Sequence, residues 1–270
     1  MDQIVKSFPS IDNLHPFYNE LIDILAEKDL IKSNLGSVGG IRRIIKKLTR
    51  DIKDKIRKST NPDDIGKLRL NFYGRVSSII KKINEQLLFL DECRFKFKNI
   101  PTFDIESPII VIAGYPNVGK SSLIRLISTA KPKIDYYPFT TRNLFVGHVI
   151  LKGTKIQIID TPGLLDRSIN ERNKIELQAI IALKHLANKI IYIFDASGNS
   201  GYSLQDQIKL FDELTELFSD TPIIACLNKT DLQSFDEISE DFSSKIHFKI
   251  STVTKEGIEE LKQHVLDDMV

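Results

Sequence analysis

Residues 109–127 read IIVIAGYPNVGKSSLIRLI, and this stretch decides the fold. Its first five residues are apolar and predict a short buried strand, whereas Ser122–Ile127 predicts a helix. Between them, Gly114–Ser121 matches the phosphate-loop pattern GxxxxGK(S/T). A strand, a glycine loop and a helix in this order direct backbone N–H groups and a helix N-terminus at phosphates. The stretch therefore predicts nucleotide binding.

The loop side chains have predicted roles in this chemistry. The Lys120 ammonium is expected to reach the β and γ phosphates and stabilise their charge, and the Ser121 hydroxyl is expected to bind Mg²⁺. Asn117 has two interpretations: it tolerates a tight loop conformation, or it helps to hold a K⁺ ion beside the phosphates. The predicted nucleotide contacts of the loop are Asn117, Val118, Gly119, Lys120, Ser121 and Ser122.

Charge is distributed unevenly along the chain. The 270 residues carry a formal net charge of +2, yet residues 41–100 hold 17 Lys and Arg against 7 Asp and Glu, a net of +10, which leaves −8 for the rest. This asymmetry predicts two modules with different partners.

Cysteine usage and hydropathy bound the class of protein. The two cysteines, Cys93 and Cys226, are too few for a disulfide framework, and no apolar run approaches 18 residues. The first ten residues lack the apolar stretch of a signal peptide. We therefore expect a cytoplasmic protein without a membrane partner.

Apolar residues of the N-terminal part recur at helical spacing and predict a small, basic, all-α helical bundle over residues 1–105. The periodicity is interrupted at Gly36–Gly40 and at Asn61-Pro62, and one long helix is expected to carry Leu68 through Leu90. Residues 101–108, bounded by two prolines, are expected to link this bundle to a second domain over residues 106–270.

Short apolar runs alternate with helical stretches after the linker. Strands are predicted at 109–113, 144–150, 155–160, 189–194, 222–227 and 246–250, with helices near 119–129, 172–187, 203–218 and 255–267. Such alternation is typical of an α/β fold with a mostly parallel, six-stranded sheet and helices on both faces. The runs 144–150 and 155–160 are joined by Lys152–Thr154, which predicts an antiparallel hairpin.

Two further segments are candidates for Mg²⁺ and γ-phosphate contacts. Asp160, at a predicted strand end, is expected to hold Mg²⁺ through a water and the Gly163 N–H to meet the γ phosphate; the alternative is an ordinary turn. In residues 137–142, Thr141 is favoured over Thr140 to bind Mg²⁺ and clasp the γ phosphate; the alternative is a strand start. The predicted catalytic residues are Lys120, Thr141 and Gly163, and the predicted metal ligands are Ser121, Thr141 and Asp160.

The segment Asn228-Lys-Thr-Asp231 favours guanine over adenine. The Asp231 carboxylate can accept hydrogen bonds from guanine N1–H and the N2 amine, and adenine offers no such pair of donors. Asn228 is expected to tie this pocket to the phosphate loop, and the Lys229 stem to cover the base. The pair Ser251-Thr252 falls where a backbone N–H would contact the guanine oxygen.

The order GYPNVGKS, FTT, DTPG, NKTD and STV is similar to that of translation-factor-type GTPases of the Obg and Nog group. The part after DTPG resembles the nucleolar GTP-binding protein (Nog) family, in its short archaeal form. The residues that carry this second resemblance are Asp166-Arg167, Glu171–Asn173, Ile175–Ala179, Ala182-Leu183, His185-Leu186, Asp195–Ser197 and Gly201–Ser203. The resemblance implies a P-loop G domain and a GTPase that assists assembly of the large ribosomal subunit. Thr252 departs from the family's usual Ser-Ala.

Leu164 stands where Ras-like proteins carry the Gln that orients the attacking water. Leucine cannot hydrogen-bond to water, so we expect slow intrinsic GTP hydrolysis, below about 10⁻² s⁻¹. A GTP-dependent, non-catalytic scaffold is the alternative. The charged side chains of Arg142, Arg167 and Arg172 are expected to face solvent.

The basic residues 41–100 have two interpretations. They bind RNA or a ribosomal precursor through phosphate contacts, or they form a solvated helix face. Phe95 and Phe97, which lie among cationic residues, either stack on bases or pack beneath the linker. The sequence carries no indication of oligomeric state.

Overall fold

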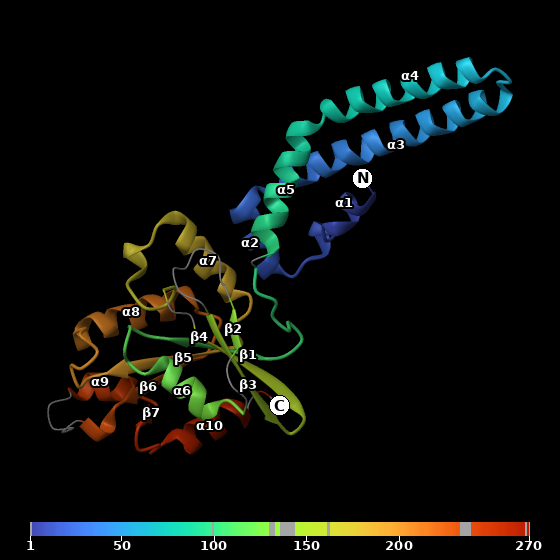
Figure 1. Cartoon of the computed structure of the whole chain (residues 1–270). Coiled ribbons are helices and arrows are strands. Elements are labelled where there is room, and N and C mark those ends of the chain that lie inside the picture. The colour runs from blue at the N-terminus through green and yellow to red at the C-terminus, as the bar shows by residue number, and fades with distance from the viewer. Residues whose placement is uncertain are drawn as a thin grey trace. The chain divides into compact units, whose positions relative to one another are not determined.

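The structure, a computed structural model, describes residues 2–98, 100–129, 133–135, 144–160, 163–232, 239–267 and 269. The chain forms two compact units, residues 1–98 and 99–270 (Figure 1). The first unit is helical, and the second is built around a sheet. No helix among the described residues is long and apolar enough to cross a membrane.

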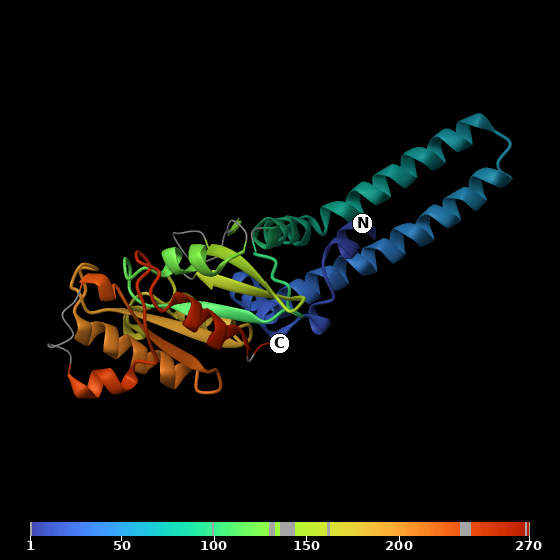
Figure 2. The same ribbon diagram turned by 90° about the horizontal axis from the view of Figure 1, so that it is seen from below.

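The helical unit packs around a small apolar core. Its elements are α1 (Asp2–Ser7), a 3-10 turn (Ile11–Asn13), α2 (Pro16–Ala26), α3 (Lys28–Lys58), α4 (Pro62–Lys81) and α5 (Asn84–Lys98). Helix α3 contacts α2, α4 and α5, and its Ile31 and Val38 are fully buried. Phe17 and Leu21 of α2 complete the same core. Helices α3 and α4 form an antiparallel pair in both views (Figures 1 and 2).

Two expectations for this unit are wrong. Helix α3 does not break at Gly36–Gly40 but continues for 31 residues. Each of the three glycines costs the helix about 1 kcal/mol, and burial of Ile31 and Val38 of the same helix offsets that cost. The single helix expected from Leu68 to Leu90 is instead two, because the chain turns at Lys82-Ile83 and places Ile83 in the core, 6% exposed.

The second unit contains a seven-stranded sheet in the order β2-β3-β4-β1-β5-β6-β7. The strands are β1 (Ile109–Ala113), β2 (Lys133–Asp135), β3 (Leu144–Leu151), β4 (Thr154–Asp160), β5 (Lys189–Asp195), β6 (Ile223–Asn228) and β7 (Phe248–Lys249). The pairs from β4 to β7 are all parallel, whereas β3 is antiparallel to both β2 and β4. The predicted α/β class, the six predicted strands and the hairpin are confirmed; the three-residue β2 is an addition.

Helices cover both faces of this sheet (Figure 2). They are α6 (Lys120–Ile127), α7 (Lys174–Lys184), α8 (Leu204–Leu217), α9 (Glu240–Lys245) and α10 (Ile258–Asp267). Helix α6 packs against β3, β4 and α10, while α8 packs against β5. The central strands are apolar on both sides, so every residue of β1 and β5 is buried. This arrangement leaves the carboxyl ends of β1, β4, β5 and β6 along one edge.

Candidate nucleotide-binding site

Polar residues gather at the carboxyl edge of the parallel strands. The phosphate loop follows β1, Asp160 ends β4, Asp195 ends β5 and Asn228 ends β6. Register places Ile112 beside Asp160 and Asp195 beside Asn228. Open parallel sheets bind ligands at this edge, because the loops after the strands converge there. The sheet therefore brings together segments that are far apart in the sequence.

Positive φ angles shape the phosphate loop. Gly114, Asn117 and Gly119 have φ of 130°, 62° and 109°. A Cβ at Gly114 would lie 2.5 Å from the Ile193 carbonyl oxygen, and one at Gly119 would lie 2.2 Å from Asn228 Nδ2. Side chains strain such backbone and have no room here, so both positions require glycine.

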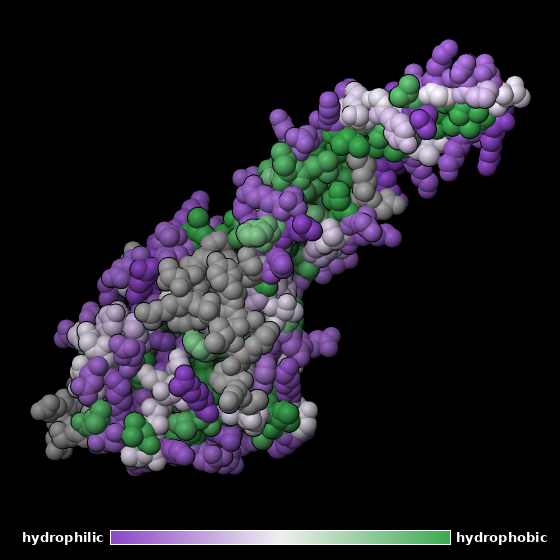
Figure 3. All heavy atoms as spheres, in the orientation of Figure 1, coloured by the Kyte–Doolittle hydropathy of each residue, from purple (hydrophilic) through white to green (hydrophobic). Residues whose placement is uncertain are grey.

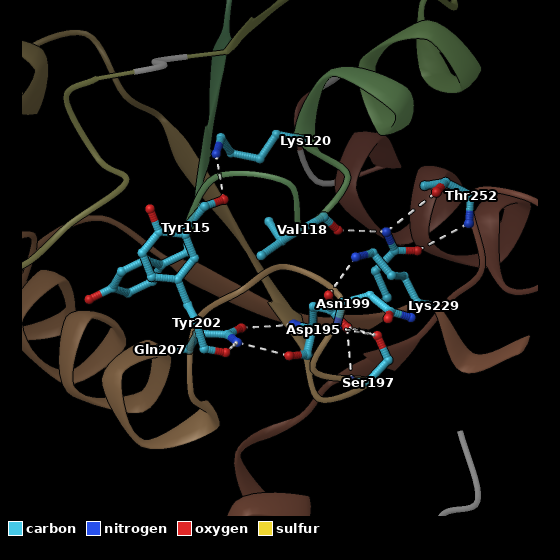
Figure 4. A network of polar contacts seen from close by, with 11 residues as sticks. Tyr115, Val118, Lys120, Asp195, Ser197, Asn199, Tyr202, Gln207, Lys229 and Thr252 are labelled. Atoms are coloured by element: carbon cyan, nitrogen blue, oxygen red, sulfur yellow. Dashed lines mark hydrogen bonds and ion pairs between the residues drawn. The ribbon is translucent and has the colours of Figure 1, made fainter. Parts of the chain in front are cut away.

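Lys120 curls back over the loop that precedes it. Its Nζ donates to the Tyr115 carbonyl oxygen at 2.7 Å (Figure 4) and to that of Gly114, also at 2.7 Å. The residue is only 7% exposed. The ammonium is thus held over the concave side of the loop, at the first turn of α6. Backbone N–H groups at a helix N-terminus and a nearby cation together suit a polyphosphate.

Ser121 and Asp160 form the part of the site that fits a metal ion. The Ser121 Oγ donates to Asp160 Oδ2 at 2.6 Å, and Asp160 is 1% exposed. Hydroxyl and carboxylate oxygens are ligands that Mg²⁺ prefers, and Mg²⁺ commonly takes the rest from phosphates and water. The described residues contain no group of three or more His, Cys, Asp or Glu side chains suited to a metal. The pair therefore fits a Mg²⁺ that arrives with a nucleotide.

Asn228 joins the phosphate loop to the base-recognition segments. Its fully buried amide donates from Nδ2 to the Val118 carbonyl oxygen at 2.7 Å and to Thr252 Oγ1 at 3.3 Å (Figure 4). Its Oδ1 accepts from the Thr252 backbone N–H at 3.0 Å. Two segments, at Val118 and at Thr252, are thereby held to one side chain, which fixes the distance between them.

Asp231 is held by Ser251, in the loop that follows β7. Its Oδ1 accepts from Ser251 Oγ at 2.5 Å, and the same Oγ accepts from the backbone N–H groups of Val253 and Thr254 at 3.2 and 3.0 Å. Ser251 is fully buried. Each carboxylate oxygen can accept two hydrogen bonds, so an Asp231 carboxylate oriented in this way can still accept from a planar pair of donors.

Asp195 and Gln207 belong to the site although the sequence analysis assigned them no role there. Lys229 Nζ pairs with Asp195 Oδ2, whose side chain is fully buried (Figure 4). The buried Gln207 amide holds Asp195 through its backbone N–H and C=O, both at 2.8 Å. The signals were available: Asp195 ends a parallel strand, and Gln207 interrupts the buried stripe of α8 formed with Leu210 and Leu214. Together they orient the Lys229 ammonium.

The segment after Asp160 is closed by a buried ion pair. The Gly163 N–H donates to Asp166 Oδ2 at 2.7 Å, and Arg172 contacts both the Gly163 carbonyl oxygen and Asp166 Oδ1. Burial lowers the pKa of the Arg172 guanidinium, while the Asp166 carboxylate opposes that shift. The expectation that Arg172 faces solvent is wrong, because its side chain is fully buried; Arg167 is half-exposed and pairs with Glu176.

The remaining residues considered in the sequence analysis are Leu164, Ser122, Thr140, Thr141 and Arg142. Leu164 is 1% exposed and Leu165 is equally buried, and the Leu165 carbonyl oxygen accepts from the Gly114 N–H at 2.9 Å. Ser122 lies in the first turn of α6. Thr140, Thr141 and Arg142 lie outside the described residues.

Comparison with known proteins identifies the family. A model described as the NOG1 N-terminal helical domain matches residues 1–104, and one described as nucleolar GTP-binding protein 1 (NOG1) matches residues 174–231. A crystal structure of a putative nucleolar GTP-binding protein 1 from Plasmodium falciparum is 34% identical, with a TM-score of 0.54; the match covers 63% of this chain and 89% of that one. The chain belongs to the nucleolar GTP-binding protein (Nog) family.

Two longer relatives also match. An uncharacterised protein of Methanocaldococcus jannaschii is 43% identical over 232 residues, and nucleolar GTP-binding protein 1 of Drosophila melanogaster is 35% identical over 280 residues. These matches cover 86% and 100% of this chain. The chain spans 65% of the archaeal relative and 43% of the Drosophila one. The resemblance stated from the residues after DTPG is thereby confirmed.

Removal of the buried arginine tests the closed segment of this Nog chain. We expect Arg172→Ala to lower the free energy of unfolding of the 99–270 unit by about 3 kcal/mol, since it leaves the Asp166 carboxylate buried without its partner. The matched control is Arg167→Ala, which removes a half-exposed pair worth under about 1 kcal/mol. Urea unfolding of the full chain, followed by circular dichroism, measures both. Equal losses in the two variants would contradict the assignment.

Proposed function

We propose that this chain binds guanine nucleotides with Mg²⁺ and hydrolyses GTP as a molecular switch. The observation that carries the proposal is the Asn228 amide, which joins the phosphate loop to Thr252 within hydrogen-bonding distance. In this frame, Lys120 would contact the β and γ phosphates, while Asp231 would accept from the guanine edge. The names of the relatives, which are GTP-binding proteins, support the same assignment.

The protein groups divide the work between binding and charge stabilisation. Lys120 would transfer its hydrogen bonds from two carbonyl oxygens to phosphate oxygens, and the N–H groups at the start of α6 would meet the same charge. Bound Mg²⁺ would neutralise charge on the β and γ phosphates. Ser121 and Asp160 would hold it, with Thr141 as a further proposed ligand. The φ of 62° at Asn117 supports its role in the tight loop conformation.

Burial of Leu164 bears on the proposed rate of GTP hydrolysis. Its side chain is 1% exposed and has no group that could orient water. We therefore propose slow intrinsic hydrolysis that a partner accelerates, and the same observation keeps a non-catalytic, GTP-dependent scaffold as the second candidate function. The proposed setting is assembly of the large ribosomal subunit in the cytoplasm.

The helical unit offers a surface for RNA. Every Lys and Arg from Arg42 to Lys58 of α3 is exposed, and α4, which is described throughout, has no buried residue. Figure 3 shows hydrophilic residues along the α3–α4 pair. Phe97 packs edge-on against Phe8 with ring centroids 6.2 Å apart, whereas Phe95 is 73% exposed and suited to stacking on a base. We propose rRNA as the partner of residues 41–100.

Base specificity is tested at Asp231. We expect Asp231→Asn to weaken GTP binding by about ten- to a hundredfold and to favour xanthosine triphosphate, whose edge has an acceptor where guanine has an amine. Calorimetry with both nucleotides and with ATP measures this. The control is Asp220→Asn, an 84% exposed carboxylate. Unchanged GTP affinity in Asp231→Asn would count against the base pocket.

Single-turnover hydrolysis separates the switch from the scaffold. We expect the chain alone to cleave GTP slower than about 10⁻² s⁻¹ and purified large ribosomal subunits to raise that rate. Phosphate release is measured with and without subunits at saturating chain concentration. If subunits bind the GTP form but leave the rate unchanged, the scaffold is the better description.

Charge reversal tests the RNA surface. We expect Arg50→Glu with Lys53→Glu to lower rRNA affinity by at least tenfold at about 0.1 M salt and to flatten its salt dependence, because phosphate contacts release counterions. Lys155→Glu with Lys209→Glu, also exposed but in the other unit, is the control for net charge. Filter binding across a salt series measures both. Equal losses in the two double variants would show only a general charge effect.

A further inference from the structure

Gly163 is held on both sides of its Cα. Its N–H belongs to the preceding peptide group and donates to Asp166 Oδ2 at 2.7 Å, and its carbonyl oxygen, in the following peptide group, accepts from Arg172. Arg172 also donates to Asp166 Oδ1 at 3.1 Å. One carboxylate and one guanidinium therefore fix both peptide planes around a residue with φ of 86°.

The far end of the same segment is anchored to α8. Ser168 Oγ donates to the Glu213 carboxylate at 2.8 and 3.0 Å, and the Ile169 N–H donates to Glu213 Oε2 at 2.7 Å. Residues 163–169 are thus pinned at Gly163 and again at Ser168-Ile169. A change at Gly163 cannot be absorbed by a shift of the whole segment unless the Glu213 contacts also break.

A carboxylate reaching back three residues to a backbone N–H is common in local turns and helix caps. Two observations set this one apart. The Arg172 side chain is fully buried and that of Asp166 is 12% exposed, which costs desolvation that a surface turn avoids. Arg172 also contacts the Gly163 carbonyl oxygen, so the pair orients the glycine as well as closing a turn.

The Gly163 N–H is the group that the sequence predicts to meet the γ phosphate of the proposed GTP ligand. A backbone N–H has one proton, and a carboxylate oxygen and a phosphate oxygen are both anionic acceptors for it. The two anions also repel each other at hydrogen-bonding distance. Occupation of this donor by Asp166 and by the γ phosphate is therefore mutually exclusive, whereas a diphosphate leaves the Asp166 contact intact.

We propose that Asp166 is an internal competitor for the γ-phosphate position and sets the preference of the site for GDP over GTP. This inference rests on the proposed function. GTP must displace the Asp166 carboxylate before the Gly163 N–H can donate to the γ phosphate. GDP has no γ phosphate and need not displace it. A ligand shifts a two-state element only by its differential affinity for the two states, so part of the γ-phosphate binding energy is spent on this displacement. Arg172, which holds the carboxylate in place, acts as a positioning residue.

Competition binding tests this assignment. Affinities of the full chain for GDP and for a non-hydrolysable GTP analogue are measured in Mg²⁺ for the native protein, Asp166→Ala and Asp166→Asn. Losing a charge-assisted hydrogen bond is expected to move the preference toward the GTP analogue by about tenfold in Asp166→Ala. Asparagine keeps a weaker, neutral acceptor, so Asp166→Asn is expected to shift the preference in the same direction by less. The control is Arg167→Gln, which alters the exposed pair next in the chain and is expected to leave the ratio unchanged.

The ratio of the two affinities separates this effect from general damage, because a loosened fold weakens both nucleotides together. If Asp166→Ala binds neither nucleotide, the Asp166→Asn ratio decides the matter. A ratio within twofold of the native value in every variant that binds, or a shift toward GDP, would overturn the inference while leaving the proposed function standing. A native chain with no affinity for either nucleotide would overturn both.

Discussion

The buried amide of Asn228 is the constraint on which the site depends. Its Nδ2 donates to the Val118 carbonyl oxygen. Residue 119 fits beside that nitrogen only because glycine has no Cβ, which would lie 2.2 Å from it. The phosphate loop therefore has its shape partly because a side chain more than a hundred residues later fills the space around it. The segments proposed to recognise phosphate and base are therefore two ends of one hydrogen-bonded unit.

A second set of hydrogen bonds, from Gln207 to Asp195, lies at the end of β5, next to the Asn228 contacts at the end of β6. Gln207 hydrogen-bonds both backbone groups of Asp195 in the way a neighbouring strand would, which extends the order of β5 past Tyr192, its last pairing with β1. Asp195 in turn holds Lys229, a residue with φ of 63°. Asp195 and Gln207 thus orient the Lys229 side chain, and neither is proposed to contact the base. Polar side chains buried at these depths require full hydrogen bonding, and here that requirement provides positional precision.

The parts of this molecule that follow local rules were predictable from sequence. The order of strands and helices from Ile109 onward follows from periodicity, and the loop at Gly114–Ser121 from its pattern. Contacts that depend on tertiary packing were not. No local rule indicates that Arg172 turns inward to Asp166, because Glu171 and Asn173 on either side of it are both exposed. The helix through Gly36–Gly40 was missed for a related reason: low helix propensity is a weak term, and burial of Val38 outweighs it.

The hydrogen bond from the Gly114 N–H to the Leu165 carbonyl oxygen has a mechanical consequence. It attaches the segment that follows β4 to the first residue of the phosphate loop, two residues beyond Gly163. Leu164 and Leu165 are also buried, each 1% exposed, so residue 165 is held in place two residues beyond Gly163. If the Gly163 amide reorients, this attachment leaves the change to be taken up within residues 163–165 and at the Ser168 and Ile169 contacts with α8.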